Sequence, residues 1–345
     1  MEIRIMEAYL YELSEDRKIR CNLCNHRCII KEGRRGICHV RENQAGILKS
    51  LVYGKLIARH IDPIEKKPLF HLLPGSLSYS IATVGCNFKC RFCQNANIAQ
   101  MPADNNGMIM GDHCIPEAIV REAEQENCQS IAYTYTEPTI YFEFAFNTAK
   151  IAHQRGIKNV FVTNGYMTPE ALEMISPYLD AANVDLKAFN NDFYKKLCGA
   201  KLDPVRESLK KMKSLGIFVE ITTLLIPGLN DDRAEIEQLA SFISEELGPE
   251  TPWHISRFHP TYHLTDRPAT PVSSLIMARE VGISAGLRYV YVGNVPGEKG
   301  EDTFCYNCGR TIIDRWGFSI RKNLVKNGHC AYCGAKIDGC WMLDA

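Results

Sequence analysis

The sequence has no excess of charge of either sign and no long apolar run. Its 345 residues carry 40 Lys and Arg against 40 Asp and Glu, which argues against nucleic-acid binding, because that depends on many cations neutralising phosphates. No stretch approaches the roughly 20 apolar residues of a membrane span, and the first residues lack the apolar run of a secretion signal. Low-complexity segments and close internal repeats are absent too. We therefore expect a globular, cytoplasmic protein that does not enter a membrane.

Positive charge gathers at one place, around Lys31, Arg34, Arg35 and Arg41. This cluster has two interpretations. It could be a local basic patch for a partner, or the solvated face of a loop, which explains it at least as well.

Cysteine, by contrast, is abundant, with 15 residues. In a reducing compartment, grouped cysteines indicate metal binding rather than disulfides. Most of them fall into three groups, at residues 21–38, 86–93 and 305–340. Cys114, Cys128 and Cys198 stand alone and are interpreted as small apolar core or surface residues.

Between Leu77 and Gly293, short apolar runs alternate with longer amphipathic patterns. This alternation is typical of βα units and a parallel sheet, and predicts an α/β fold with an open or complete TIM-like (βα) barrel. We expect an amino-terminal cysteine-rich module at 1–76, the barrel at 77–296 and a zinc-ribbon-like module at 297–345. The expected strands lie near residues 77–84, 130–135, 159–163, 181–186, 218–225 and 253–258, with a last one at 288–293.

A C-x3-C-x2-C motif of Cys86, Cys90 and Cys93 follows the first expected strand, in T-V-G-C-N-F-K-C-R-F-C-Q-N. Three thiolates leave one iron of a cubane cluster without a protein ligand. A zinc knuckle or an electron-transfer cluster is the alternative, but both usually need four ligands, and the next cysteine is Cys114. With Phe92 before the third cysteine, the motif resembles that of the radical S-adenosylmethionine (SAM) superfamily.

This resemblance implies a [4Fe-4S] cluster on the three cysteines and SAM as the second cofactor. One electron would cleave SAM to a 5′-deoxyadenosyl radical that abstracts hydrogen from a substrate. In the superfamily the aromatic residue at the position of Phe92 packs near the adenine. Residues that act on the substrate itself stay unknown from the sequence.

Further polar residues follow the later expected strands. By the same resemblance, Glu137 of E-P-T receives the methionine amino group, although Tyr135 and Thr136 replace the two glycines of the family segment. Asp185 and Lys187 are two apart and point to one side of their strand. They form a structural ion pair, or Lys187 binds the SAM carboxylate while Asp185 takes a ribose hydroxyl or a cation.

The chain order of these segments, with D-L-K and F-H-P, is similar to that of the pyruvate formate-lyase activating enzyme branch. The T-N-G turn follows the third expected strand, where its polar groups can face a ligand. In that branch the residue matching His259 sits near the nucleoside. The expected cofactor contacts are Phe92, Glu137, Thr163, Asn164, Asp185, Lys187 and His259.

Two further groups of four cysteines flank the barrel. Cys305, Cys308, Cys330 and Cys333 form two C-x2-C knuckles, each followed by glycine, which predict a zinc ribbon with a second iron–sulfur cluster as the alternative. Cys340 is interpreted as a spare thiol. The amino-terminal group has a less regular spacing and His26 as an alternate ligand; zinc is favoured there over an iron–sulfur cluster. Its members are Cys21, Cys24, Cys28 and Cys38.

The amino-terminal spacing followed by V-R-E-N resembles that of radical SAM proteins of the AmmeMemoRadiSam system, which implies Memo and AMMECR-type partners. The expected function is hydrogen abstraction from a protein or peptide, as in glycyl-radical activases, with flavodoxin or ferredoxin as reductant. A small molecule or RNA is the alternative substrate. From another class, the chain could be an electron carrier or a non-catalytic iron–sulfur and zinc scaffold.

Overall fold

The computed structural model describes residues 6–295 and 299–340. Its centre is an eight-stranded sheet of order β16-β15-β14-β13-β12-β11-β9-β8. From β9 to β16 all neighbours pair in parallel, which confirms the predicted α/β class. Because β16 and β8 are the two ends of the order, the barrel is partial. The strands are β8 (Ala58–Pro63), β9 (Leu77–Ala82), β11 (Ser130–Tyr133), β12 (Lys158–Thr163), β13 (Ala181–Asp185), β14 (Phe218–Leu225), β15 (Trp253–Arg257) and β16 (Val290–Gly293).

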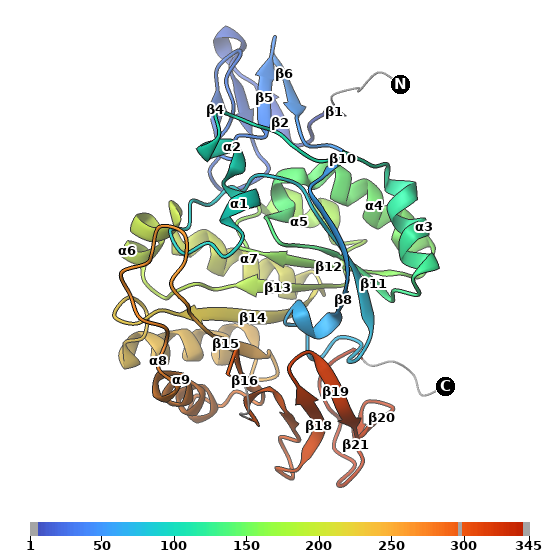
Figure 1. Ribbon diagram of the computed structural model, residues 1–345, viewed down its shortest axis with the longest axis vertical. Helices are drawn as coiled ribbons and strands as arrows, with labels where there is room; N and C mark the ends of the chain where they lie inside the picture. Colours follow the sequence, from blue (N-terminus) through green and yellow to red (C-terminus); the bar gives the residue numbers. More distant parts are fainter. Residues whose placement is uncertain (1–5, 296–298, 341–345) are drawn as a thin grey trace.

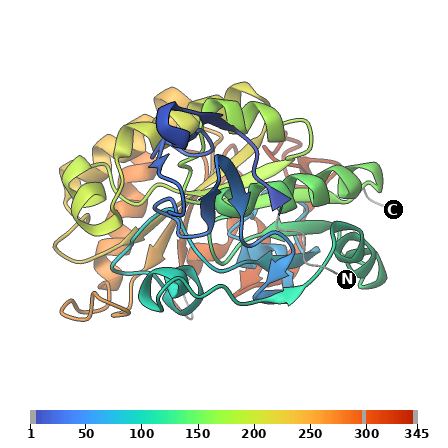
Figure 2. The same ribbon diagram turned by 90° about the horizontal axis from the view of Figure 1, so that it is seen from above.

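Helices cover the outer face of this sheet (Figures 1 and 2). On α7, for example, Leu202, Val205, Leu209 and Met212 are buried at helical spacing against the sheet. Since helices cover one face and side chains fill the interior, strands such as β11 are buried at every residue. The helices are α3 (Pro116–Gln125), α4 (Phe142–Gln154), α5 (Pro169–Ile175), α6 (Asn191–Phe193), α7 (Leu202–Ser214), α8 (Arg233–Phe242) and α9 (Val272–Ser284), with short α1 (Ala96–Ala99) and α2 (Met101–Asp104) near the first strand.

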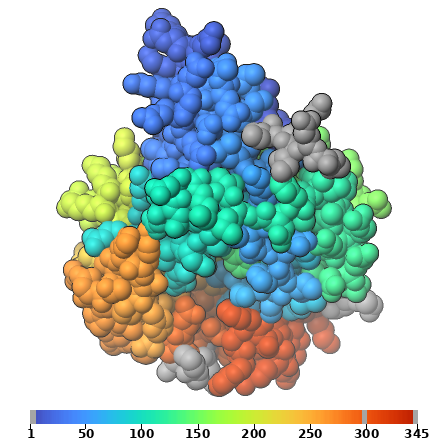
Figure 3. Space-filling view, turned by 45° about the horizontal axis from the view of Figure 1, so that its top comes forward, coloured from blue at the N-terminus to red at the C-terminus, as the bar shows by residue number. Residues whose placement is uncertain are grey.

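The amino-terminal module projects from one end of the molecule (Figures 1 and 3). It contacts the loop after β12, where Asn25 N–H donates to Tyr166 O at 3.0 Å and the backbones of Cys24 and Met167 form an isolated antiparallel β-bridge. It contains two small three-stranded sheets. The first has the order β1 (Met6–Glu7), β6 (Ile47–Ser50), β5 (Arg41–Gln44), and the second has the order β2 (Tyr11–Leu13), β3 (Ile19–Cys21), β4 (Ile29–Ile30). A further pair joins β7 (Lys55–Leu56) to β10 (Asp112–His113).

The segment expected to form only this module, 1–76, also supplies a barrel strand. Strand β8 pairs antiparallel with β9, from Ala58 opposite Ala82 to Pro63 opposite Leu77. The expected boundary between 296 and 297 lies outside the described residues.

The carboxyl-terminal module lies beside β16 and the segment that follows β8 (Figure 1). Phe70, Tyr289 and Tyr291 pack in one apolar cluster with Cys305 and Ile313. The buried Arg315 donates to Phe70 O at 2.9 Å and to Thr303 Oγ1 at 2.6 Å. The module therefore covers the open side of the barrel. Its strands are β17 (Thr303–Phe304), β18 (Thr311–Trp316), β19 (Ser319–Asn323), β20 (Val325–Lys326) and β21 (His329–Cys330).

His71 joins this module to the barrel and makes the junction sensitive to acid. Its Nδ1 lies 2.6 Å from Asp338 O and its Nε2 lies 2.6 Å from Tyr291 Oη. Neutral imidazole satisfies both contacts, donating to the carbonyl and accepting from the hydroxyl. Burial lowers the pKa of His71 to about 4, from an ordinary 6.5.

We expect this group to contribute stability above pH 6.5 that is lost as the pH falls toward 4, because the unfolded chain binds the proton more readily in that interval. Between pH 8 and pH 5 the loss should be about 2 kcal/mol of unfolding free energy. Denaturant unfolding of His71→Gln should show a correspondingly smaller difference between the two pH values. His113→Gln, at an exposed histidine, is the matched control; equal pH dependence in all three proteins would contradict the assignment.

Among the described residues, no helix has both the length and the apolar character needed to cross a membrane.

Candidate active site

A cavity of about 570 Å³ lies at the carboxyl ends of the parallel strands. The loops that follow β9, β11, β12 and β13 supply most of its polar lining. Active sites of βα barrels are built at this end, because loops from several strands converge there. Six of the seven expected cofactor contacts line it, namely Phe92, Glu137, Thr163, Asn164, Asp185 and Lys187, together with Cys86, Cys90 and Cys93.

The loop carrying the three cysteines is held by backbone hydrogen bonds to residues 197–198. Lys89 N–H donates to Cys198 O at 2.8 Å and Arg91 N–H to Leu197 O at 2.9 Å. Gly85, just before Cys86, has φ +101°, and a Cβ there would lie 2.6 Å from Val40 Cγ1. The glycine of V-G-C is therefore required for the close approach of the amino-terminal module.

Burial and the charge of Glu137 raise the pKa of Cys86 well above its ordinary value, and burial raises the pKa of Cys93 to about 11. Three thiolates beside a carboxylate, one of them buried and two half-buried, need a compensating cation, because low-dielectric surroundings penalise unpaired charge. Iron would supply that charge and would favour the deprotonated form of the thiols that hold it. The donor set of three thiolates thus fits a cubane cluster with one iron left open.

Cys198 lies beside this loop, although its isolation in the sequence suggested an inert residue. It is fully buried at the end of a π-helix (Tyr194–Cys198), and its thiol hydrogen-bonds the Cys90 side chain. That hydrogen bond lowers the pKa of Cys90. The only sequence signal was the following Gly199, which adopts φ +68° to end the helix.

Glu137 ties the ends of β11 and β12 together. It is 2% exposed, and one carboxylate oxygen accepts from Thr163 Oγ1 at 2.7 Å and from the backbone and hydroxyl of Thr139. The other accepts from Asn164 N–H at 2.8 Å. Burial raises the pKa of Glu137, while these hydrogen bonds oppose the rise. The second oxygen accepts only one of these hydrogen bonds, so it can accept another from a cationic group in the cavity.

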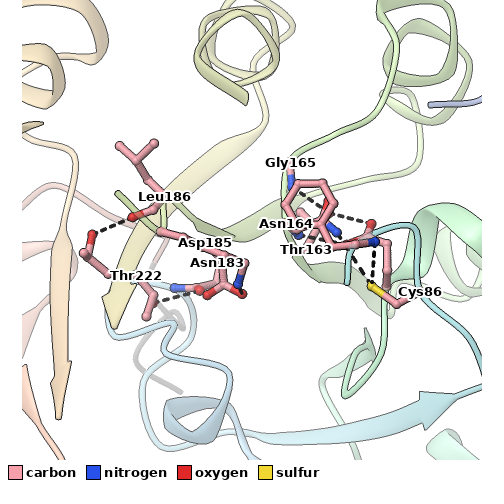
Figure 4. Close-up of polar contacts among 12 residues, drawn as sticks. Cys86, Thr163, Asn164, Gly165, Asn183, Asp185, Leu186 and Thr222 are labelled. Carbon is pink, nitrogen blue, oxygen red and sulfur yellow. Dashed lines mark hydrogen bonds and ion pairs between the residues drawn. The ribbon is translucent and has the colours of Figure 1, made fainter. Parts of the chain in front are cut away.

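Figure 4 shows two groups of side chains facing the cavity from different strands. On one side, Asn164 Nδ2 donates to Asn87 Oδ1 at 2.6 Å and lies 3.9 Å from Cys86 Sγ. On the other, Thr222 Oγ1 donates to Asn183 Oδ1 at 2.9 Å, next to Asp185. The T-N-G turn is therefore locked to the cysteine loop through Asn164.

Asp185 and Lys187 form the ion pair that was one of their two interpretations, with Nζ 2.8 Å from Oδ2. Burial alone would lower the pKa of Lys187, but Asp185 and Cys90 raise it well above its ordinary value. Lys187 is therefore a fixed cation, and its Nζ lies 5.9 Å from the centre of the Phe92 ring. Both charged groups also line the cavity, so a ligand carboxylate can share the lysine.

His259 does not line the cavity and is exposed. Strand β15 ends at Arg257, and Phe258 turns into the core with its N–H bonded to Thr270 Oγ1 at 2.9 Å. This turn directs the next residue outward. The histidine that lines the cavity is His254, whose Nε2 lies 2.7 Å from Glu220 Oε2.

A third part of the wall, missed in the sequence, comes from the segment before β9. Lys67 Nζ lies 2.6 Å from Asp62 Oδ2 and 4.7 Å from the centre of the Tyr135 ring. The Tyr135 hydroxyl donates to the same carboxylate. Tyr135 has φ +60°, in the left-handed region that favours glycine, and its contacts with Asp62 and Lys67 offset that strain.

The sequence profile of the Radical SAM superfamily matches residues 80–243. The uncharacterized protein MJ0808 of Methanocaldococcus jannaschii is 50% identical over 334 residues, which cover 96% of this chain and 98% of its own. The chain belongs to the radical SAM superfamily. It is a radical SAM enzyme, and membership implies a [4Fe-4S] cluster and SAM.

Radical SAM relatives with named activities include the pyruvate formate-lyase-activating enzyme of Clostridium pasteurianum. It is 23% identical over 165 residues, which cover 46% of this chain and 66% of the relative. The SAM-bound structure of Streptococcus suis SuiB has a TM-score of 0.51 at 16% identity, over 67% of this chain and 54% of that one. That structure supports the fold alone.

The flanking cysteines of this radical SAM enzyme lie away from the cavity. In the carboxyl-terminal group, the Sγ atoms of Cys305 and Cys333 are 3.7 Å apart and those of Cys308 and Cys330 are 3.8 Å apart. All four Sγ atoms lie within 4.8 Å of one another. The four amino-terminal cysteines line a second, small cavity behind the central cysteine loop.

Proposed function

We propose that the enzyme abstracts hydrogen from a protein or peptide substrate, in the manner of glycyl-radical activases. The observation that carries this proposal is the convergence of Cys86, Cys90 and Cys93 with Glu137 and the Asp185–Lys187 pair on one cavity. The cluster and SAM supply the 5′-deoxyadenosyl radical when both are bound.

In this proposal the three cysteines hold the cluster, and the surrounding side chains orient SAM. The second carboxylate oxygen of Glu137 accepts a hydrogen bond from the methionine ammonium group of SAM, and Lys187 pairs with the SAM carboxylate. Asp185 accepts from a ribose hydroxyl, while Phe92 packs beside the adenine. Thr163 and Asn164 hold the carboxylate of Glu137 in place through the hydrogen bonds described above.

The macromolecular substrate is supported by relatives named for activating pyruvate formate-lyase and isethionate sulfite-lyase. A formal net charge of zero weakens the case for an RNA substrate, because RNA binding depends on many cationic side chains. By resemblance, Memo and AMMECR-type proteins are proposed as partners, and a cytoplasmic flavodoxin or ferredoxin as electron donor.

The substrate class is tested by following 5′-deoxyadenosine formation anaerobically with reduced, reconstituted enzyme and SAM. An extract of the source cells is divided into a filtrate of small molecules, a nuclease-treated protein fraction and a protease-treated fraction. We expect the protein fraction to stimulate product formation and protease to abolish the stimulation. Stimulation by the filtrate alone, or its loss on nuclease treatment, would contradict a protein substrate.

We also propose that the carboxyl-terminal cysteines bind zinc. A Zn–S bond of about 2.3 Å sets the thiolates of a tetrahedral site about 3.8 Å apart, and the paired Sγ atoms lie 3.7 and 3.8 Å apart. Cys305 and Cys330 are buried within the apolar cluster of the module, so the ion would connect its two knuckles.

Replacing Cys308 and Cys330 by serine should remove about one zinc ion per chain and lower the thermal stability, because a structural zinc site contributes folding energy. Elemental analysis and thermal unfolding measure the two effects. Cys340→Ser, which removes an exposed thiol outside the knuckles, should keep its zinc. Unchanged zinc in the double variant would refute the site.

A further inference from the structure

Four cysteines from three segments of the amino-terminal module converge on one small cavity. Cys21 ends β3, Cys24 and Cys28 lie in the following turn, and Cys38 precedes β5. The remaining lining is largely apolar, with Leu23, Ile30 and Ile37 among its residues.

The spacing of these thiols differs from that of the carboxyl-terminal group. Of the thiols in the described residues, only the carboxyl-terminal set includes three or more Sγ atoms that all lie within 4.8 Å of one another. Four thiolates on a single zinc ion must stand that close. In an iron–sulfur cluster they bind different iron atoms and stand farther apart. The Sγ atoms of the central triad, Cys86, Cys90 and Cys93, likewise do not all lie within 4.8 Å of one another.

Two buried N–H donors at the cavity have no hydrogen-bond partner among the described residues. They are Arg41 Nε and Asn87 Nδ2, on side chains that are 2% and 1% exposed and line the cavity. Arg41, expected from the sequence on a solvated or basic face, is instead buried with Nη1 2.9 Å from Glu143 Oε1. Orphaned buried donors are costly, so a ligand that accepts from them is expected at this place.

We propose that Cys21, Cys24, Cys28 and Cys38 hold a second iron–sulfur cluster, packed against the loop of the central cysteines. Four thiolates complete its coordination, and its inorganic sulfides accept hydrogen bonds from Arg41 and Asn87. Zinc-bound thiolates also accept hydrogen bonds, so the choice of a cluster over zinc rests on the open spacing of the four thiols.

Asn87 connects this second site to the active site. Its backbone carbonyl lies 2.8 Å from His26 Nε2, and its side-chain Oδ1 accepts from Asn164. His26 is thereby engaged with the central loop and is not needed as a ligand. Cys86, a ligand in the proposed active site, is adjacent to Asn87, so the two sites share one wall.

The test is the metal content of the full chain with Cys86, Cys90 and Cys93 all replaced by alanine, after anaerobic reconstitution with iron and sulfide. We expect about two or four iron atoms with equal sulfide per chain, according to cluster type, and visible sulfide-to-iron absorption. About one zinc should remain at the carboxyl-terminal site. Two zinc ions and no iron would overturn the proposal.

Adding Cys24→Ser and Cys28→Ser to that variant should abolish the residual iron while leaving the zinc unchanged. The matched control, Cys128→Ser, removes a buried cysteine elsewhere in the barrel and should keep the iron. Iron that persists without Cys24 and Cys28 would place the cluster elsewhere and refute the assignment. If the triple variant fails to fold, the native chain decides, because it should hold about two or four iron atoms more than the one cubane of the central triad supplies.

Discussion

Replacing Cys90 by alanine should reduce 5′-deoxyadenosine formation to background, a loss of more than the roughly 100-fold that changes beside a metal site typically cause. Cys90 lies in the middle of the triad, and its side chain is 7% exposed. Without it the central loop offers only two thiolates, so a second iron of the cubane would lack a protein ligand. The measurement is product formation together with iron content after anaerobic reconstitution.

The neighbouring Cys198 gives this experiment a sharp control. Because the Cys198 thiol hydrogen-bonds the Cys90 side chain, residual turnover in Cys90→Ala could come from Cys198 acting as a substitute ligand. The Cys90→Ala, Cys198→Ala double variant removes that route, whereas Cys128→Ala leaves the loop intact. Turnover that survives in the double variant would mean that Cys90 is not a cluster ligand.

Replacing Glu137 by glutamine should weaken SAM binding by roughly 10- to 100-fold, as expected for losing hydrogen bonds to a charged group. The carboxylate accepts from Asn164 N–H, Thr139 N–H and two threonine hydroxyls. A glutamine side chain must turn an N–H₂ group toward some of these donors, and it loses the negative charge offered to an ammonium group.

Equilibrium dialysis of SAM against the cluster-loaded variant measures this loss. Glu117→Gln, at an exposed position on α3, is the matched control. Iron content equal to that of the unchanged protein would separate a SAM-binding defect from loss of the cluster. A dissociation constant equal to that of the control would refute the role of Glu137.

The barrel was predictable because each parallel strand carries its own apolar pattern and ends in a polar segment. The strands near 77–84 and 218–225, for example, match β9 (Leu77–Ala82) and β14 (Phe218–Leu225). Residues adjacent to strand ends, such as Glu137 and Lys187, were found because carboxyl ends of parallel strands meet at one edge.

Other features depend on contacts that no local pattern reports. Strand β8 has exposed and half-buried residues along most of its length, so it lacks the apolar signature of its neighbours. The outward position of His259 is set by a turn that Thr270 fixes, from 12 residues beyond Phe258. Cys198 stands at the end of a π-helix and meets Cys90 across a separation of more than 100 residues in the chain.

The carboxyl-terminal module also protects the edges of the central sheet against pairing with other chains. An open sheet leaves unpaired N–H and C=O groups on its two outermost strands, which can template pairing with another chain. Here the outermost strands are β16 and β8, and the module packs on Tyr291 of one and on Phe70, which follows the other. If the four cysteines of the module bind zinc as proposed, chelating that zinc should uncover sites for intermolecular strand addition and cause aggregation.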